Sequence, residues 1–292
     1  MKVYQLLNKI SKFFSLRFFH AGLPISYYIF NRIFNKKIIN KNIKNKNLQD
    51  FYKNGFVKLD INFKNEVELI KKNIAFVNHD EKRQSYKINE NIRDQFKVML
   101  LNKLKPLISD LQDYYNSNVV ISNVLAWRTN YADELEAKKN MIYANHYHND
   151  GYLVTYFKIF INLMDIDEND GPLHIVYKNK TKQFFKLANY KNQTNYDDIE
   201  NDKLIYKNVG KEGDTFLFSS SECMHKAGVP IKHRDTMEVV FIANTNKSLK
   251  TENIDIFEKN DDFVMSTTKP YTLIKVFRTL ISHLSYKKKL ST

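Results

Sequence analysis

The segment ANHYHNDGY, residues 144–152, concentrates side chains that bind metal ions. It carries His146, His148 and Asp150 at alternate positions, and imidazole nitrogens and carboxylate oxygens are ordinary ligands of transition metals. Successive side chains of a strand point to opposite faces, so either His146 with His148 or His148 with Asp150 can reach one ion from the same side. Spacing alone leaves both pairs open.

A third ligand has to come from elsewhere in the chain, and His225 in SSSECMHKAGVP is the best candidate. Two histidines and one carboxylate leave about three coordination positions open, the arrangement expected for non-haem Fe(II) that binds a cosubstrate together with O2. Three histidines, His146, His148 and His225, would suit a cupin-type site instead. Such a site usually has a glutamate soon after the His-x-His pair, whereas here the first one after His148 is Glu168.

An anion-binding pair follows nine residues after His225. HRDTMEVVF, from residue 233, is predicted to be a strand with Arg234 and Thr236 on one face. The planar fork of a guanidinium together with a hydroxyl can bind one carboxylate. The sequence therefore predicts an acidic cosubstrate beside the metal site.

These groups need a scaffold of strands, and the chain supplies one after Val119. Short β-branched and aromatic runs follow one another there, separated by turn signals such as Asn169-Asp170-Gly171-Pro172; they are VVISNVLAWRTN, YLVTYFKIFINLM, LHIVY, DTFLFSS and MEVVFIAN. A helical pattern from Asn91 to Tyr115 precedes them. We expect a mainly β fold with flanking helices, either a sandwich or a jelly roll, and no Gly-rich phosphate loop.

Four segments in this order resemble the phytanoyl-CoA dioxygenase family of Fe(II)/2-oxoglutarate oxygenases. They are His148-Asn149-Asp150, FKIFINLMDIDENDGPLHIV, GDTFLFSSSECMHKAGVP and Arg234-Asp235-Thr236. In addition, FYKNGFVKLDI at residues 51–61 resembles the opening strand of that family, so the likeness covers roughly residues 48–245.

The resemblance implies a double-stranded β-helix (jelly-roll, cupin-like) core and Fe(II) bound by His148, Asp150 and His225. It also implies that Arg234, assisted by Thr236, binds the distal carboxylate of 2-oxoglutarate, which O2 converts to succinate and CO2 while a substrate is hydroxylated. Related halogenases carry a small residue in place of Asp150, so hydroxylation is the expected outcome. The chain departs from the family at residues 177–180, where Tyr-Lys-Asn-Lys replaces a Pro-Gly-Ser-His turn beside the active-site mouth.

Four further residues are candidates for binding the cosubstrate or the substrate. In TYFKIFINL, one strand face is apolar and the other carries Lys158 and Asn162. That second face is either a solvated outer face or the lining of the barrel mouth, where Lys158 would pair with the cosubstrate carboxylate and Asn162 would contact substrate. His146 and Arg128 are the other candidate substrate contacts, although a surface ion pair is the simpler expectation for Arg128.

The basic character of the chain lies at its two ends. The formal net charge is +14, but residues 1–50 hold ten Lys or Arg against one acid, and residues 269–292 hold six against none. Both ends have apolar residues at helical spacing. We expect a basic amphipathic extension and linker at 1–47, an oxygenase domain at 48–268 and a basic amphipathic helix at 269–292. These ends either pack on the domain or rest on an anionic membrane surface; they lack the Arg-rich, aromatic-interleaved pattern of nucleic-acid binding.

The remaining expectations concern location and substrate. The single cysteine, Cys223, fits a reducing compartment, and charged residues interrupt the first apolar runs before they reach signal-peptide or membrane-spanning length. We expect a cytoplasmic enzyme, or one held at the inner face of a membrane, whose substrate is a small molecule, a saccharide or a lipid-linked compound. The alternatives are a cupin-type metalloenzyme that does not use 2-oxoglutarate and a non-catalytic jelly-roll binding module.

Overall fold

The computed structural model describes residues 39–40, 42–78, 83–133, 135–137, 145–148, 150, 156–187 and 203–244. The predicted amphipathic helices at both ends lie outside these residues, so the domain limits at 48 and 268 stay predictions. Within the described part of the chain, no helix is long and apolar enough to cross a membrane.

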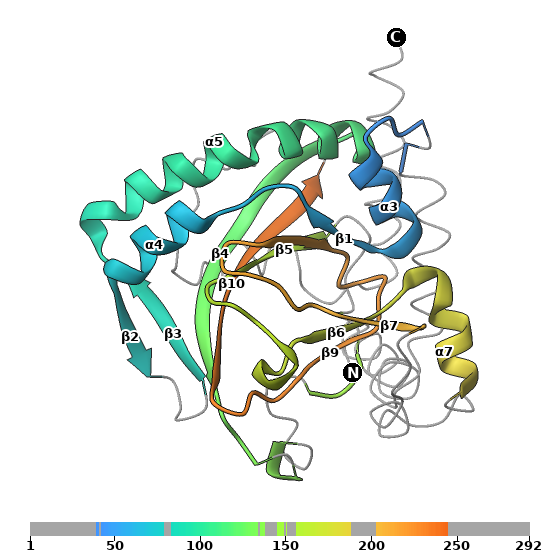
Figure 1. Ribbon diagram of the computed structural model, residues 1–292. Helices are drawn as coiled ribbons and strands as arrows, with labels where there is room; N and C mark the ends of the chain where they lie inside the picture. Colours follow the sequence, from blue (N-terminus) through green and yellow to red (C-terminus); the bar gives the residue numbers. More distant parts are fainter. Residues whose placement is uncertain are drawn as a thin grey trace, which may run out of the picture.

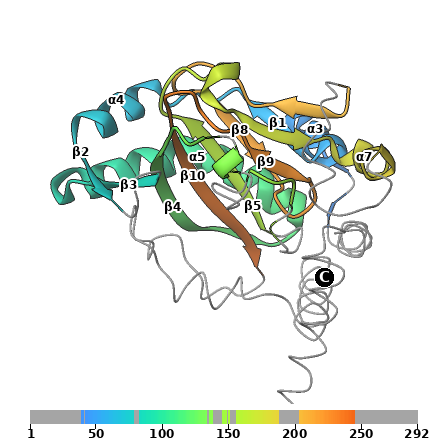
Figure 2. The same ribbon diagram turned by 90° about the horizontal axis from the view of Figure 1, so that it is seen from below.

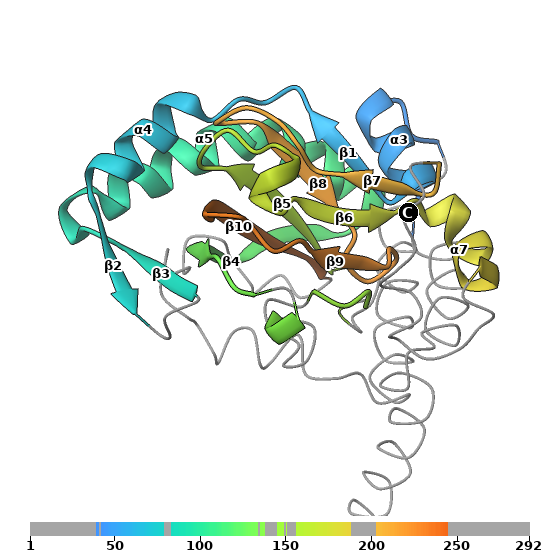
Figure 3. The same ribbon diagram turned by 60° about the horizontal axis from the view of Figure 1, so that its bottom comes forward.

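Two antiparallel sheets lie one across the other beneath a layer of helices (Figures 1 and 3). The larger sheet has the order β1-β8-β5-β10-β4-β3-β2, and the smaller has the order β7-β6-β9. The strands of the larger sheet are β1 (Phe56–Leu59), β2 (Ile74–Asn78), β3 (Arg83–Ile88), β4 (Asn118–Asn130), β5 (Tyr156–Asn162), β8 (Thr215–Phe218) and β10 (His233–Asn244). The strands of the smaller sheet are β6 (Leu173–Val176), β7 (Ile205–Lys207) and β9 (His225–Ala227).

From β4 onward the chain passes back and forth between the two sheets. Strands β4, β5, β8 and β10 are neighbours in the larger sheet, while β6, β7 and β9 form the smaller one. The segment around His148 adds a further strand position to the smaller sheet, because His148 forms an antiparallel bridge with His225. Strand positions that alternate between two sheets in this way form a double-stranded β-helix, which confirms the predicted jelly-roll class.

Helices cover the outer face of the larger sheet (Figures 1 and 2). They are α3 (Lys46–Asn54), α4 (Lys64–Lys72) and α5 (Glu90–Tyr115), while α7 (Thr181–Leu187) lies near β7 at one end of the smaller sheet. The predicted helix from Asn91 to Tyr115 is confirmed. It buries residues spaced three and four apart, namely Phe96, Leu100, Leu104, Leu107, Leu111 and Tyr114.

Strand alternation divides the larger sheet into a helix-covered face and an inner face. On β5 and β10, Phe157, Ile159, Met237, Val239 and Phe241 belong to the core cluster shared with the helices. The inner face carries the intervening residues, which include Tyr156, Lys158, Phe160, Arg234, Thr236 and Glu238. Of the two alternatives for the polar face of TYFKIFINL, the structure therefore selects the lining of the barrel.

The opening strand is shorter than the sequence predicts. Residues 51–54 complete α3, and only Phe56–Leu59 form β1, which pairs with β8. Gly55 separates the two elements at φ 81°, and a Cβ at this position would lie 2.2 Å from Cys223 Sγ. A residue with a side chain would meet both the left-handed backbone and this contact, so the turn requires glycine.

Candidate metal centre

His148, Asp150 and His225 bring one ligand atom each within 4.8 Å of one another. Asp150 Oδ1 lies 3.8 Å from His148 Nε2 and 3.6 Å from His225 Nε2. Adjacent ligands of an octahedral ion with bonds of about 2.1 Å are about 3 Å apart, so a small closure would bring these three atoms to ligating distance. The sequence-predicted ligand set is thus assembled at one place.

The two histidines are oriented by their own backbone neighbourhoods. His148 Nδ1 lies 2.7 Å from the carbonyl oxygen of His146, and His225 Nδ1 lies 3.0 Å from that of Cys223. An Nδ1–H donated to a carbonyl leaves the Nε2 lone pair for a metal, the usual arrangement of histidine ligands. Backbone hydrogen bonds of 2.9 and 2.8 Å between His148 and His225 hold the strand positions together.

His146 contributes its backbone to the site. Its side chain is buried, and the cluster of ligand atoms found among the described residues contains Asp150 but not His146. The geometry therefore favours the His-x-Asp pair over the His-x-His pair that spacing left open.

The protonation states suit a cation. Burial, reinforced by the charge of His225, lowers the pKa of His148 to about 4, which leaves the imidazole neutral near pH 7. Burial by itself would raise the pKa of Asp150, but Lys158 and the two histidines outweigh it and hold that pKa well below its usual range. The site thus offers a neutral imidazole from His148 and a carboxylate from Asp150, beside the ring nitrogen of His225.

Lys158 lies against two carboxylates of the chain itself. Its Nζ is 2.9 Å from Asp150 Oδ2 and 3.3 Å from Glu238 Oε2. Burial would lower the pKa of Lys158, but the two carboxylates raise it well above its ordinary value, so the ammonium stays charged. Sequence reasoning missed Glu238, although it shares a strand face with Arg234 and Thr236, and alternation could have found it.

Arg234 and Thr236 are both buried, and this pair is called the anion slot after the role that the sequence predicts for it. Their exposures are 7% and 6%, and the Arg234 guanidinium donates a long hydrogen bond of 3.4 Å to the Gly228 carbonyl. Among the described residues, no carboxylate forms an ion pair with Arg234, and the buried Thr236 Oγ1 has no hydrogen-bond partner. Burial, then the nearby cation Arg83, lowers the pKa of Arg234 to about 10. A buried guanidinium and a buried hydroxyl that lack such partners among the described residues fit an anionic ligand.

The other candidates divide between the two sides of the sheet. Asn162 is opposite Thr236 in the pairing of β5 with β10, so it lies beside the anion slot. Arg128 is opposite Asp235 in the pairing of β4 with β10, and these two side chains lie on the other face of the sheet from Thr236. Arg128 donates two hydrogen bonds of 2.7 Å to the Asp235 carboxylate. The structure therefore groups Asn162 with the site and places Arg128 outside it.

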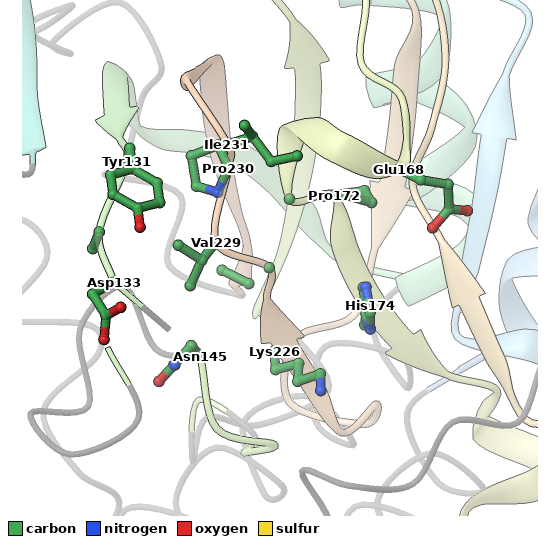
Figure 4. A pocket seen from close by; sticks show the side chains of 14 residues that line it. Tyr131, Asp133, Asn145, Glu168, Pro172, His174, Lys226, Val229, Pro230 and Ile231 are labelled. Carbon is green, nitrogen blue, oxygen red and sulfur yellow. The ribbon is translucent and has the colours of Figure 1, made fainter. Parts of the chain in front are cut away.

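A cavity of about 450 Å³ lies close by but is separate from the ligand cluster. Figure 4 shows Asp133 and Asn145 on one side of it and Lys226 and His174 on the other. His174 and Lys226 pair in register on β6 and β9, and the lining also includes Gly228, whose carbonyl accepts a hydrogen bond from Arg234. None of the three candidate ligands lines it.

Comparison with known proteins gives structural neighbours only. No protein-family model matches the chain, and no curated protein matches it by sequence. HygX from Streptomyces hygroscopicus with nickel, 2-oxoglutarate and hygromycin B bound is similar at 14% identity and TM-score 0.44, over 68% of this chain and 87% of that chain. EctD from S. alaskensis with bound Fe is similar at 14% identity and TM-score 0.45, over 81% and 90%.

A third neighbour is SnoN, a non-heme alpha ketoglutarate dependent epimerase from nogalamycin biosynthesis. It is similar at 11% identity and TM-score 0.44, over 68% of this chain and 81% of that chain. All three TM-scores are below 0.5, so the assignment of this chain to the double-stranded β-helix class rests on its own strand order.

Proposed function

We propose that this protein is an Fe(II)- and 2-oxoglutarate-dependent dioxygenase that hydroxylates its substrate with O2 and releases succinate and CO2. The observation that carries the proposal is the buried slot formed by Arg234 and Thr236, because a three-ligand metal site alone would fit several activities. A buried guanidinium that has no carboxylate partner among the described residues, on the strand face that leads to the candidate metal ligands, calls for an acidic cosubstrate.

The residues fit the proposed groups. Two imidazoles and one carboxylate, from His148, His225 and Asp150, suit Fe(II) and leave about three positions open. Thr236 lies two residues, about 7 Å, along the strand from Glu238, whose partner Lys158 contacts Asp150. One end of a five-carbon diacid would therefore lie at the slot while the other reaches the metal.

Each residue has a distinct task in this proposal. His148, Asp150 and His225 hold the ion, which when bound supplies the redox chemistry that couples O2 to decarboxylation of the cosubstrate and hydroxylation of the substrate. Arg234 and Thr236 bind the distal carboxylate and so orient the keto acid end. The barrel interior excludes water from these contacts and strengthens them.

The substrate is proposed to be a small molecule or a saccharide- or lipid-linked compound, with His146 and Asn162 as candidate contacts. Both residues are buried. We place the enzyme in the cytoplasm, where the basic ends would hold it on the inner face of a membrane.

Turnover and binding test the proposal together. Purified protein with Fe(II), 2-oxoglutarate and O2, supplied with pools of candidate substrates, should form succinate; Asp150→Ala should abolish this, whereas Asp165→Ala, which removes an exposed carboxylate, should not. Binding of 2-oxoglutarate to the Ni(II)-loaded protein covers the case in which the right substrate is missing from the pools.

The alternatives give different results in the same experiment. A cupin-type site using His146, His148 and His225 would bind metal equally well in Asp150→Ala and would ignore 2-oxoglutarate. A non-catalytic module would bind neither. Absence of both succinate formation and metal-dependent 2-oxoglutarate binding would reject the proposed function.

A further inference from the structure

The two oxygens of Asp150 have different neighbours. Oδ1 lies 3.8 Å from His148 Nε2 and 3.6 Å from His225 Nε2, which places it within the ligand cluster. Oδ2 lies 2.9 Å from Lys158 Nζ. One oxygen therefore faces the candidate metal position, and an ammonium occupies the other.

Glu238 holds the ammonium from its other side. Lys158 Nζ is 3.3 Å from Glu238 Oε2, and the side-chain exposures of Lys158, Asp150 and Glu238 are 14%, 16% and 11%. Charges this deeply buried need partners, and a lysine between two carboxylates lies within ion-pair distance of both. Lys158 and Glu238 come from β5 and β10, which are hydrogen-bonded neighbours, so the pair is built into the sheet.

We propose that Lys158, anchored by Glu238, is a positioning residue that keeps Asp150 a metal ligand through Oδ1 alone. This rests on the proposed function, since it takes Asp150 as a metal ligand. If the ammonium were absent, no other cation among the described residues would face Oδ2, and its charge would turn to the metal ion. The carboxylate would then bind through both oxygens and occupy a position that the cosubstrate and O2 need.

This assignment differs from the sequence-based prediction that Lys158 binds the cosubstrate carboxylate. In the structure that task has its own cation, Arg234, while the charge of Lys158 is already balanced by Asp150 and Glu238. The two roles make different demands on the metal: only a positioning role changes how many positions Asp150 occupies.

Counting the water molecules on bound Mn(II) separates the two roles. Electron–nuclear double resonance of the Mn(II)-loaded protein in isotopically labelled water should find about three bound waters in the wild type. Lys158→Met should lose one of them, and Lys158→Arg, which keeps a cation beside Oδ2, should retain all of them. Lys58→Met is the matched control, because Lys58 also pairs with a carboxylate, that of Asp214, but its side chain is 53% exposed.

A double variant protects the test against misfolding. Lys158→Met alone leaves the buried Glu238 carboxylate without a partner, whereas Lys158→Met with Glu238→Gln removes both charges. The double variant should show the same loss of one water. An unchanged water count in both variants overturns the inference, and if 2-oxoglutarate binding weakens at the same time, Lys158 is a cosubstrate ligand.

Failure of the proposed function gives a different result. If wild-type protein does not bind Mn(II), or binds it equally well in His148→Ala and His225→Ala, the metal centre itself is wrong. If instead the wild type binds Mn(II) through these residues while Lys158→Met leaves the number of bound waters unchanged, the metal centre stands and the role of Lys158 is rejected.

Discussion

Arg234 is the residue whose environment makes least sense without a ligand. Buried cations in proteins are normally paired, and an unpaired one destabilises the fold. Among the described residues, Arg234, which is 7% exposed, makes a long hydrogen bond to a carbonyl, and the nearby Thr236 hydroxyl has no hydrogen-bond partner. The proposed binding of the 2-oxoglutarate carboxylate would supply a partner to both.

Replacing Arg234 should therefore separate binding from stability. Arg234→Met should weaken 2-oxoglutarate binding to the Mn(II)-loaded protein about 30- to 4000-fold, because the loss of one partner of a buried charge pair costs about 2–5 kcal/mol. The melting temperature without cosubstrate should not fall, since the variant removes a charge that burial disfavours. Isothermal titration calorimetry and thermal unfolding measure the two quantities.

Arg128→Met is the matched control for that variant. Arg128 makes two hydrogen bonds to Asp235 on the other face of the same pair of strands, and Asp235 is 4% exposed. Its removal should lower the free energy of unfolding by about 3 kcal/mol and leave the cosubstrate affinity unchanged. The opposite pattern, with Arg128 affecting affinity and Arg234 only stability, would move the anion site to the outer face.

At the scale of elements, the smaller sheet carries a row of basic side chains. His174 on β6 pairs in register with Lys207 on β7 and with Lys226 on β9. Burial first, then the charges of Lys226, Lys207 and Arg234, lower the pKa of His174 to about 4. The imidazole is thus kept neutral by the sheet pairing that surrounds it.

This row predicts a loss of stability in mild acid. Above pH 6.5 His174 is neutral in both the folded and the unfolded chain; between pH 6.5 and about 4 only the unfolded chain takes up a proton, so the free energy of unfolding falls. His174→Gln should remove about 1–3 kcal/mol of this fall, measured by urea unfolding of the metal-free protein. The pKa of His148 is also lowered to about 4, so part of the pH dependence of the free energy of unfolding should remain in His174→Gln.

Lys226→Gln gives an independent check on the cause. Removing one neighbouring charge should let the folded chain take up the proton at higher pH, so the variant should lose less stability on acidification than the wild type. A slope unaffected by either substitution would mean that His174 does not contribute to it.

At the scale of the whole molecule, the excess of positive charge and the two sheets lie in different parts of the sequence. The excess of positive charge lies in residues 1–50 and 269–292, whereas the candidate metal ligands, Arg234, Thr236 and both sheets lie in the nearly neutral region between them. Charge at the ends can thus be changed without substituting a candidate site residue. The membrane proposal concerns these ends and is tested there.

Vesicle binding should depend on charge if the ends rest on a membrane. The full chain should co-sediment with vesicles that contain phosphatidylserine and not with neutral ones, and high salt should release it. Replacing Lys287, Lys288 and Lys289 by Gln should weaken this binding by about 3 kcal/mol, or roughly 100-fold. Equal binding to neutral and anionic vesicles, or no binding, would contradict the electrostatic proposal.

Sequence alone determined which side chains share a face. The two-residue period of a strand places Arg234 with Thr236, and the 3.6-residue period of a helix predicts the buried stripe of α5. Both are local rules that need no knowledge of the partner. The same rule left both His146 and Asp150 open as partners of His148, and the resemblance, carried by the order of four segments along the chain, implied the set His148, Asp150 and His225.

Only the tertiary structure decided which face turns inward and which strands lie side by side. The pairing of Lys158 with Asp150 and Glu238 joins three segments that are distant in sequence, and the choice of Asp150 over His146 depends on where those segments meet. Both outcomes follow from the helices covering one face of the larger sheet and from the register of β5 against β10. These are long-range packing interactions, and no local period in the sequence contains them.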